Sequence, residues 1–207
     1  MMPRTIRAVG AVGALVEAED GAAAQRLAAW VANHPHRHLL DEVIPGARTL
    51  YLAGPSRIVR DIARQAAVAA LEPNTATTTS RLITVDVRYD GADLAEAAAR
   101  LDITPAQLIQ CHTGQEFVVQ FFGFSPGQAF FAGLPQQLQL PRRSTPRVCV
   151  PTGSVAIANE FTVIYPGNSP GGWSLIGTRI SAPLWNSESS PPNLVSVGDR
   201  VRFRAMP

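Results

Sequence analysis

The residues best suited to bind an anion are arginines, because this chain of 207 residues contains no lysine. The absence of lysine excludes a P-loop lysine, a Schiff base and a lysine general base. Arg142, Arg143 and Arg147 form the one basic cluster, with Thr145 between them. A guanidinium group can bind a carboxylate, a phosphate or carboxylated biotin through paired hydrogen bonds. The alternative is a solvated turn in which these arginines pair with surface acids.

Glycine-rich turns form a second set of candidate binding residues. In Ser169-Pro170-Gly171-Gly172-Trp173, consecutive glycines would let backbone N–H groups approach an anion or a carbonyl oxygen. The structural alternative is a tight β-turn in which Trp173 fills a barrel. Tyr165 either donates a hydrogen bond or packs at a strand end. The full set of candidate substrate-binding residues is Gly127, Gln128, Arg142, Arg143, Thr145, Arg147, Tyr165, Ser169, Gly171 and Gly172.

His112 is the candidate catalytic residue, as a general base or a ligand donor. It ends a predicted helix, where the helix dipole favours a charged histidine, so a structural role is the alternative. Cys111 precedes it, but adjacent helical residues point in different directions, so the two form no catalytic pair. No Ser-His-acid arrangement is recognisable in the sequence.

No metal site and no disulfide are expected. The two cysteines, Cys111 and Cys149, are too few for a zinc site, and we expect two buried thiols. His34, His36 and His38 alternate along a segment that contains a proline, but no acid or cysteine completes a metal site. We therefore expect a polar loop there.

The composition indicates a folded, soluble protein. Hydrophobic residues make up 46% of the chain and charged residues 16%, which argues against disorder. No apolar run reaches the roughly eighteen residues of a membrane helix. Met1 to Val12 contains no signal peptide pattern, so we expect a cytoplasmic protein with no membrane partner. A formal net charge of +2 argues against nucleic acid as a partner.

Residues 1–90 show the alternating strand and helix patterns of a small α+β domain. The expected elements are a strand from Ala11 to Ala18, a helix opened by Asp20, strands from Leu39 to Ile44 and Thr49 to Leu52, a helix from Ser56 to Ala70, a polar loop from Glu72 to Ser80 and a strand from Leu82 to Tyr89. Their order, β-α-β-β-α-β, is that of a ferredoxin-like split βαβ unit. This order predicts a four-stranded sheet with both helices on one side.

Residues 91–207 have a different pattern, typical of a β-barrel preceded by a helical bridge. Helices are expected from Asp93 to Leu101 and from Thr104 to His112. Beyond them, short apolar runs such as Glu116 to Phe124 are separated by glycine or proline every several residues, which indicates a closed all-β architecture. The last strand, Arg200 to Ala205, alternates apolar residues with arginines and is predicted to be an edge or half-exposed strand. The fold class is therefore α+β.

Several ordered motifs in this second half resemble one known family. They are Gly123-Phe124-Ser125-Pro126-Gly127, Gly133-Leu134-Pro135, Pro141 to Arg147, Val150 to Ile157 and Tyr165 to Gly177. The chain is identified by these motifs as a member of the KipI-like group, which includes the B subunit of 5-oxoprolinase and proteins labelled allophanate hydrolase subunit 1. The resemblance implies a small α+β domain followed by a cyclophilin-like barrel.

The resemblance also implies a function as one subunit of a larger enzyme. Most members resemble a subunit of ATP-dependent 5-oxoprolinase, which opens the lactam of pyroglutamate to glutamate. The implied partner is a homologous barrel subunit, and the implied substrate is a small amide or lactam in a cleft between the two barrels. ATP is then used by the complex, and its binding site lies on this chain or on a partner. The alternatives are an inhibitor of a sensor histidine kinase and the carboxyltransferase component of a biotin-dependent urea carboxylase.

The sequence departs from the family pattern after Pro126-Gly127. The family usually has an aromatic-rich stretch there, whereas this chain has Gln128-Ala129-Phe130-Phe131-Ala132-Gly133. Ser125 also replaces a commonly apolar residue. If this loop contacts the ligand, the substrate preference is expected to differ.

Overall fold

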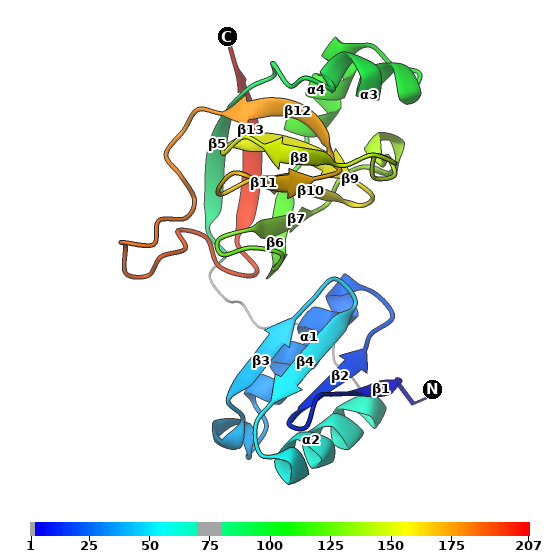
Figure 1. Cartoon of the computed structure of the whole chain (residues 1–207), viewed down its shortest axis with the longest axis vertical. Helices are drawn as coiled ribbons and strands as arrows, with labels where there is room; N and C mark the ends of the chain where they lie inside the picture. Colours follow the sequence, from blue (N-terminus) through cyan, green and yellow to red (C-terminus); the bar gives the residue numbers. More distant parts are fainter. Residues whose placement is uncertain (1–2, 70–79) are drawn as a thin grey trace. The chain divides into compact units, whose positions relative to one another are not determined.

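The chain is divided into two units, Met1–Thr77 and Thr78–Pro207, in a computed structural model that describes residues 3–69 and 80–207 (Figure 1). The predicted boundary between residues 90 and 91 is therefore wrong. The strand predicted from Leu82 to Tyr89 lies in the second unit, because it pairs with strands of the barrel. The predicted loop from Glu72 lies outside the described residues, apart from Ser80.

The first unit contains a four-stranded antiparallel sheet. Its strands follow the order β1 (Ile6–Val9), β2 (Gly13–Glu17), β4 (Thr49–Ala53) and β3 (Glu42–Pro45). Adjacent strands are antiparallel throughout, from Ile6 opposite Val16 to Val43 opposite Leu52. Side chains on β2 and β4 alternate between buried and half-buried, so one face of the sheet forms a core.

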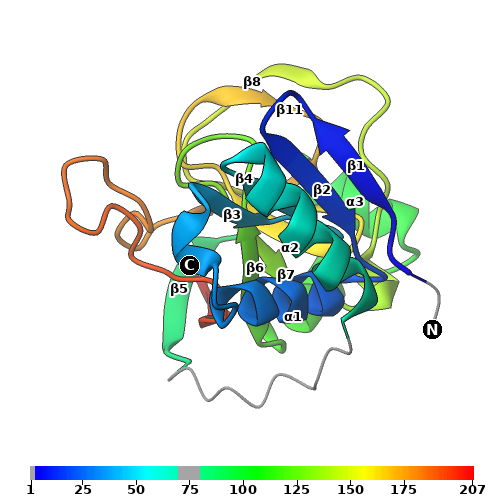
Figure 2. The same cartoon turned by 90° about the horizontal axis from the view of Figure 1, so that it is seen from below.

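Two helices cover that buried face. Helix α1 (Gly21–Ala32) begins where the side chain of Asp20 accepts a hydrogen bond of 2.7 Å from the backbone of Ala23, as the sequence predicts. Helix α2 (Ser56–Val68) buries one stripe of side chains, including Val59 and Ile62. Figure 2 shows the two helices side by side, and they contact each other and the strands. The predicted end of α2 at Ala70 lies outside the described residues.

The strand order of this sheet is that of a ferredoxin-like unit, but its fourth strand comes from another part of the chain. The prediction placed Leu82–Tyr89 beside the first strand of the motif. Residues of β1 take that edge instead, joined to β2 by a tight hairpin that includes Gly10 at a φ of 59°. The sequence analysis missed β1 because its four residues are all exposed and carry no alternating pattern.

The second unit is a closed barrel of seven strands, which confirms the prediction (Figure 1). Around the barrel the strands are β10 (Phe161–Ile164), β7 (Ala129–Ala132), β6 (Phe117–Phe122), β13 (Arg200–Met206), β5 (Leu82–Arg88), β12 (Ser174–Arg179) and β9 (Ser154–Ala158). A core of large apolar side chains fills it, among them Phe117, Phe131 and Phe203. The fold class α+β is likewise confirmed.

Strand β13 is not an edge strand, because it lies between β5 and β6. It pairs with β5 in parallel along its whole length, from Arg200 opposite Leu82 to Met206 opposite Arg88. The predicted half-exposed pattern is present: Val201 and Phe203 are buried, and the alternating arginines face outward. These arginines form ion pairs, such as that of Arg204 with Asp86.

A pair of helices and a small sheet flank the barrel. Helix α3 (Leu94–Arg100) and helix α4 (Pro105–Thr113) form the predicted bridge, and Thr104 and Gln107 form a capping box at the start of α4. Strands β8 (Arg147–Val150) and β11 (Ser169–Gly171) form a separate two-stranded sheet. The remaining short elements are the 3-10 turns η1 (Arg37–Leu39) and η2 (Gln136–Leu138). None of the helices seen in residues 3–69 and 80–207 has the length and apolar character needed to span a membrane.

Candidate functional site

The glycine-rich turns and the arginine segment meet at one pocket of the barrel, which we call the aromatic pocket. Its volume is about 300 Å³, at the small end of the range for ligand pockets. Five of the ten predicted substrate-binding residues line it. The lining residues are Phe124, Gln128, Phe130, Arg142, Pro146, Val163, Tyr165, Pro170, Gly171, Gly172 and Trp173.

Two segments far apart in the sequence are held together at this pocket by a backbone hydrogen bond. The amide of Arg143 donates to the carbonyl of Gly172 at 2.7 Å, so the segment before β8 runs beside the segment after β11. The β6–β7 loop supplies a third side. Phe124 there has a φ of 71°, a strained value for a non-glycine residue, and its side chain is 71% exposed at the pocket mouth.

Aromatic rings form one wall of the aromatic pocket. Trp173 is buried, and its ring meets that of Phe130 edge to face at 5.7 Å between centroids. Phe130 in turn stacks on Phe121 at 4.3 Å. The guanidinium of Arg142 lies 5.6 Å from the centroid of the Trp173 ring, within the range of a cation–π interaction. The wall can therefore receive a flat ligand beside a positive charge.

Gln128 supplies a buried hydrogen-bond acceptor to the same pocket. The residue is only 2% exposed, and its Oε1 atom has no hydrogen-bond partner among residues 3–69 and 80–207. A buried amide oxygen without a partner costs roughly 1–3 kcal/mol of stability, so such atoms are rare in folded proteins. The position of Gln128 on the pocket wall makes a ligand N–H group a suitable partner.

Tyr165 lines the pocket with a protonated hydroxyl group. Burial raises the pKa of Tyr165, and the nearby charges of Arg142 and Arg147 only partly oppose this effect. The hydroxyl therefore keeps its proton at neutral pH and can donate a hydrogen bond. Gly171 makes room for it, since a Cβ atom at position 171 would lie 2.3 Å from the Tyr165 oxygen.

The structure separates the three clustered arginines into two groups. Arg143 and Arg147 bind the carboxylate of Asp93 at 3.1 and 2.6 Å, and Arg143 also binds Glu96 at 3.1 Å. The paired arginines are therefore engaged by acidic residues of the barrel unit, and their role in binding a ligand stays a prediction. No ion pair of Arg142 occurs in the part of the chain that the structure describes, which leaves it as the ligand-binding candidate.

Asp93, which the sequence analysis treated only as a helix start, is the centre of this arrangement. It is 2% exposed, and its second oxygen accepts a hydrogen bond of 2.8 Å from the amide of Leu175 on β12. Burial by itself raises the pKa of Asp93, but the hydrogen bonds from Arg147 and Leu175 and the charges of both arginines outweigh burial and lower it. An ionised Asp93 therefore anchors the arginine segment to the barrel.

His112 does not line the aromatic pocket, and its environment is that of a structural residue. It is fully buried, and its ring packs against those of Phe117 and Phe203, with centroids 5.0 and 4.6 Å away. One ring nitrogen is 2.7 Å from the hydroxyl of Tyr89 and the other 3.1 Å from that of Thr162. A neutral imidazole has one donor and one acceptor, which match these two hydroxyls.

The pKa of His112 supports the same conclusion. Burial lowers the pKa of His112 to about 3, so the ring is neutral at physiological pH. A general base must lie within hydrogen-bond reach of the substrate, and both nitrogens of His112 are already bonded inside the barrel. The geometry therefore favours the structural alternative for His112 over the predicted catalytic role.

The remaining predicted binding residues lie outside the aromatic pocket. Gly127 lines a second pocket, where its φ of 76° and the ring of Trp185 exclude a side chain. Thr145 lies in a polar surface depression with Arg100 and Arg142. Ser169 lies in a shallow surface hollow, and its buried hydroxyl has no hydrogen-bond partner in the described part of the chain.

Histidines and cysteines add no further site. His34 contacts Gln65 through one ring nitrogen, and its other nitrogen accepts from the backbone of His36. No group of three or more His, Cys, Asp or Glu suited to a metal ion is found among residues 3–69 and 80–207. Cys111 is half-buried, whereas Cys149 on β8 is exposed. The expectation of two buried thiols is therefore wrong for Cys149, because β8 belongs to the small two-stranded sheet and not to the barrel wall.

Comparison with known proteins extends over both units. The sequence model of the family described as "Carboxyltransferase domain, subdomain C and D" matches residues 4–195. The B subunit of 5-oxoprolinase from Escherichia coli O157:H7 is 40% identical over 172 residues, which cover 78% of this chain and 76% of that protein. The B subunit of 5-oxoprolinase from Bacillus subtilis (strain 168) is 40% identical over 126 residues, covering 59% of this chain and 52% of that protein.

A solved structure is also similar along nearly the whole chain. The protein TTHA0988 is 32% identical in sequence and superimposes on 98% of this chain with a TM-score of 0.76. This chain spans 40% of the length of TTHA0988. The similarity thus covers one part of a larger polypeptide.

Proposed function

The chain belongs to the family of the carboxyltransferase domain, subdomain C and D, and on this basis we propose that it is one subunit of a multi-subunit enzyme of the 5-oxoprolinase type. The relatives named as the B subunit of 5-oxoprolinase support this assignment at 40% identity. A protein named as a subunit works with other chains. We infer that the partner is a homologous barrel subunit, which completes the site around the aromatic pocket.

The observation that carries the proposal is the combination of groups in the aromatic pocket. 5-Oxoproline is a flat lactam with one carboxylate, one ring N–H and one ring carbonyl. Arg142 suits the carboxylate, and the unpartnered Oε1 of Gln128 suits the ring N–H. The ring would lie against Trp173 and Phe130, and the protonated hydroxyl of Tyr165 is a donor for the carbonyl.

One surface depression has residues that suit the phosphates of ATP but none that suit its base. The polar depression beside Arg142 has a volume of about 400 Å³ and is lined by Glu96, Arg100, Arg142, Arg143, Ser144 and Thr145. Arg100, Arg142 and the two hydroxyl groups are donors that fit a phosphate group. None of these lining residues has an apolar or aromatic side chain to receive a purine, so we assign adenine binding to a partner subunit. ATP would supply a phosphoryl group that activates the lactam carbonyl.

In this arrangement the residues of the chain bind and orient the substrate. Arg142 borders both the aromatic pocket and the polar depression. Its guanidinium can therefore bind the carboxylate of 5-oxoproline beside the depression in which the phosphates of ATP would lie. Two hydrogen bonds on one face of the lactam would fix its orientation toward the depression. No side chain of this chain is required as a nucleophile, which agrees with the buried position of His112.

The first test is reconstitution. The purified chain alone should show no hydrolysis of ATP that depends on 5-oxoproline, and addition of its partner subunits should restore this activity. The measurement is glutamate formation together with phosphate release. Full activity of the single purified chain would contradict the subunit assignment.

The second test separates substrate binding from stability. Gln128→Met removes the buried acceptor at similar volume, so we expect a higher melting temperature and, in the assembled enzyme, a KM for 5-oxoproline raised about tenfold. Arg142→Gln should raise KM at least about tenfold without a gain in stability. Arg88→Gln is the matched control, because Arg88 is a barrel arginine that lines none of the pockets described above. An unchanged KM in both pocket variants would contradict the assignment of the pocket.

The description of the family favours a second candidate function, the transfer of a carboxyl group. The carboxylate of carboxylated biotin would bind Arg142 in the same pocket, with the ring system against Trp173. Avidin distinguishes the two functions: it should abolish a biotin-dependent carboxyl transfer by the assembled enzyme and leave ATP-dependent lactam opening unchanged.

A further inference from the structure

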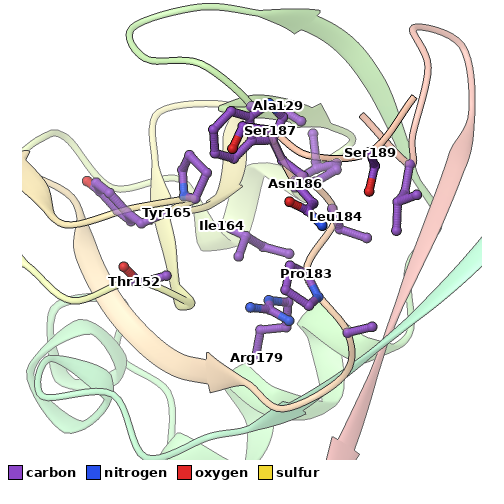
Figure 3. A pocket seen from close by; sticks show the side chains of 16 residues that line it. Ala129, Thr152, Ile164, Tyr165, Arg179, Pro183, Leu184, Asn186, Ser187 and Ser189 are labelled. Atoms are coloured by element: carbon purple, nitrogen blue, oxygen red, sulfur yellow. The ribbon is translucent and has the colours of Figure 1, made fainter. Parts of the chain in front are cut away.

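A second pocket lies behind Tyr165, between the barrel and the loop that joins β12 to β13, and we call it the loop pocket (Figure 3). Its volume is about 430 Å³, larger than that of the aromatic pocket. Tyr165 lines both cavities and forms a shared wall. The loop pocket contains none of the predicted binding residues except Gly127 and Tyr165.

Most of the loop pocket is apolar. Phe131 and Ile164 of the barrel contribute buried side chains, and Leu184, Trp185 and Leu194 of the loop lie across from them. The backbone of Trp185 forms an isolated antiparallel β-bridge with Asn193. Its indole lies against Gly127, where the absence of a side chain makes room for it. The pocket can therefore receive the apolar part of a small ligand.

One positive charge interrupts this apolar lining. Arg179 lies at the end of β12 and lines the loop pocket, where Figure 3 shows it near Ile164 and Pro183. One of its side-chain N–H groups donates to the carbonyl of Ser181. Within the described ranges 3–69 and 80–207, no carboxylate lies within ion-pair distance of Arg179.

The absence of a carboxylate partner distinguishes Arg179 from the other half-buried arginines of the barrel, Arg143 and Arg147, which both bind Asp93. Burial lowers the pKa of Arg179, because low-dielectric surroundings disfavour the charged form. A partly buried cation without a counter-ion is costly, and an anionic ligand would relieve that cost. The hydroxyl groups of Thr152, Ser187 and Ser189 also line the pocket, so its polar surface is not limited to Arg179.

We propose that the loop pocket binds a small organic carboxylate with a flat apolar body, with the carboxylate on Arg179 and the apolar body against Trp185. A single guanidinium suits one carboxylate, and the apolar wall gives no partner to an inorganic anion. This site is separate from the aromatic pocket and does not depend on the proposed function.

The three tryptophans of the chain allow a direct test, because each reports on a different place. Trp185 lines the loop pocket, Trp173 lines the aromatic pocket and Trp30 lies on α1 of the first unit. The full chain is labelled with 5-fluorotryptophan, and its three ¹⁹F signals are assigned with single Trp→Phe variants. Benzoate is then titrated as the probe, with benzamide as its neutral counterpart and inorganic phosphate as a bare anion.

Benzoate should shift the Trp185 signal in a saturable way and leave the Trp30 signal unchanged. Benzamide and phosphate should bind at least about tenfold more weakly than benzoate. Benzamide lacks the negative charge, and phosphate lacks the apolar body. Arg179→Gln should weaken benzoate binding by a similar factor, and Arg179→Lys should restore part of it. Ser187 is an exposed residue that lines the loop pocket, so Ser187→Phe should fill part of the pocket and weaken benzoate binding.

The proposal is overturned if benzoate shifts only the ¹⁹F signal of Trp173 or shifts no tryptophan signal. It is also overturned if the Arg179→Gln variant binds benzoate with the same affinity as the unaltered chain. Equal binding of benzoate and benzamide overturns it as well. If a variant fails to fold, the comparison of benzoate with benzamide on the unaltered chain still decides the question.

Discussion

At the scale of single residues, one buried carboxylate decides which arginine is available to a ligand. Asp93 binds Arg143 and Arg147, which leaves Arg142 on the wall of the aromatic pocket. The same carboxylate holds β12 through Leu175. Asp93 is therefore a positioning residue, because it acts on a ligand only through the arginine segment.

We expect Asp93→Asn to destabilise the barrel by about 2 kcal/mol at neutral pH, since two half-buried guanidinium groups lose their counter-ion. The pKa of Asp93 is lowered in the folded chain, so its stabilising effect is complete above the ordinary aspartate pKa of about 4 and is lost as the pH falls through the folded value. The stability difference between Asp93→Asn and the unaltered chain should therefore shrink on acidification. Urea unfolding at several pH values measures this.

Glu96→Gln provides the control for this prediction. Glu96 binds the same Arg143, but its side chain is 54% exposed, so its loss should change the free energy of unfolding by less than about 1 kcal/mol. A stability difference for Asp93→Asn that stays constant down to acidic pH would contradict the role assigned to Asp93.

At the scale of elements, the small sheet of β8 and β11 shapes the aromatic pocket. Gly171 on β11 pairs with Arg147 on β8, and the hydroxyl of Tyr165 lies close to Gly171. A side chain at position 171 would meet the Tyr165 oxygen at 2.3 Å and a methyl group of Val150 at 3.0 Å. Glycine is required there for close approach and not for an unusual φ.

Gly171→Ala should therefore displace Tyr165 and destabilise the chain by roughly 1–3 kcal/mol. Gly167→Ala, four residues earlier in the same connection, is a matched control, because an added Cβ would meet nothing within 4 Å. Thermal unfolding measures the effect on stability, and the affinity of the assembled enzyme for its substrate measures the effect on the pocket. Equal melting temperatures for the two variants would show that position 171 tolerates a side chain.

At the scale of the whole molecule, closure of the barrel depends on a strand that precedes both bridging helices. Strand β5 pairs with β13 on one side and with β12 on the other, and its Val85 and Val87 are fully buried. Without β5, β12 and β13 would each have an unpaired edge. The second unit therefore begins before β5.

A fragment of residues 78–207 should fold by itself and unfold cooperatively, whereas a fragment of residues 91–207 should not. The shorter fragment lacks β5, so it exposes two strand edges and part of the barrel core. Circular dichroism during heating and size-exclusion chromatography distinguish the outcomes. Cooperative folding of residues 91–207 would contradict the boundary between the two units.

Local patterns in the sequence were sufficient to predict most elements and the type of fold. The side chain of Asp20 caps α1 and Thr104 caps α4, as predicted, because capping depends only on residues within one turn. Frequent glycines and prolines correctly indicated a barrel. The motifs of the second half also identified the family, and five predicted binding residues lie together in the aromatic pocket.

Only the tertiary structure decided the pairing of distant residues. The exposed hairpin strand β1, rather than Leu82–Tyr89, completes the first sheet, because strand pairing depends on three-dimensional neighbours. Arg143 and Arg147 pair with an acid about fifty positions earlier in the chain, which no local pattern reveals. His112 is enclosed by rings from β6 and β13. Helix and strand propensity and helix capping depend on a few neighbouring residues. Burial and ion pairing depend instead on which distant residues the folded chain brings together.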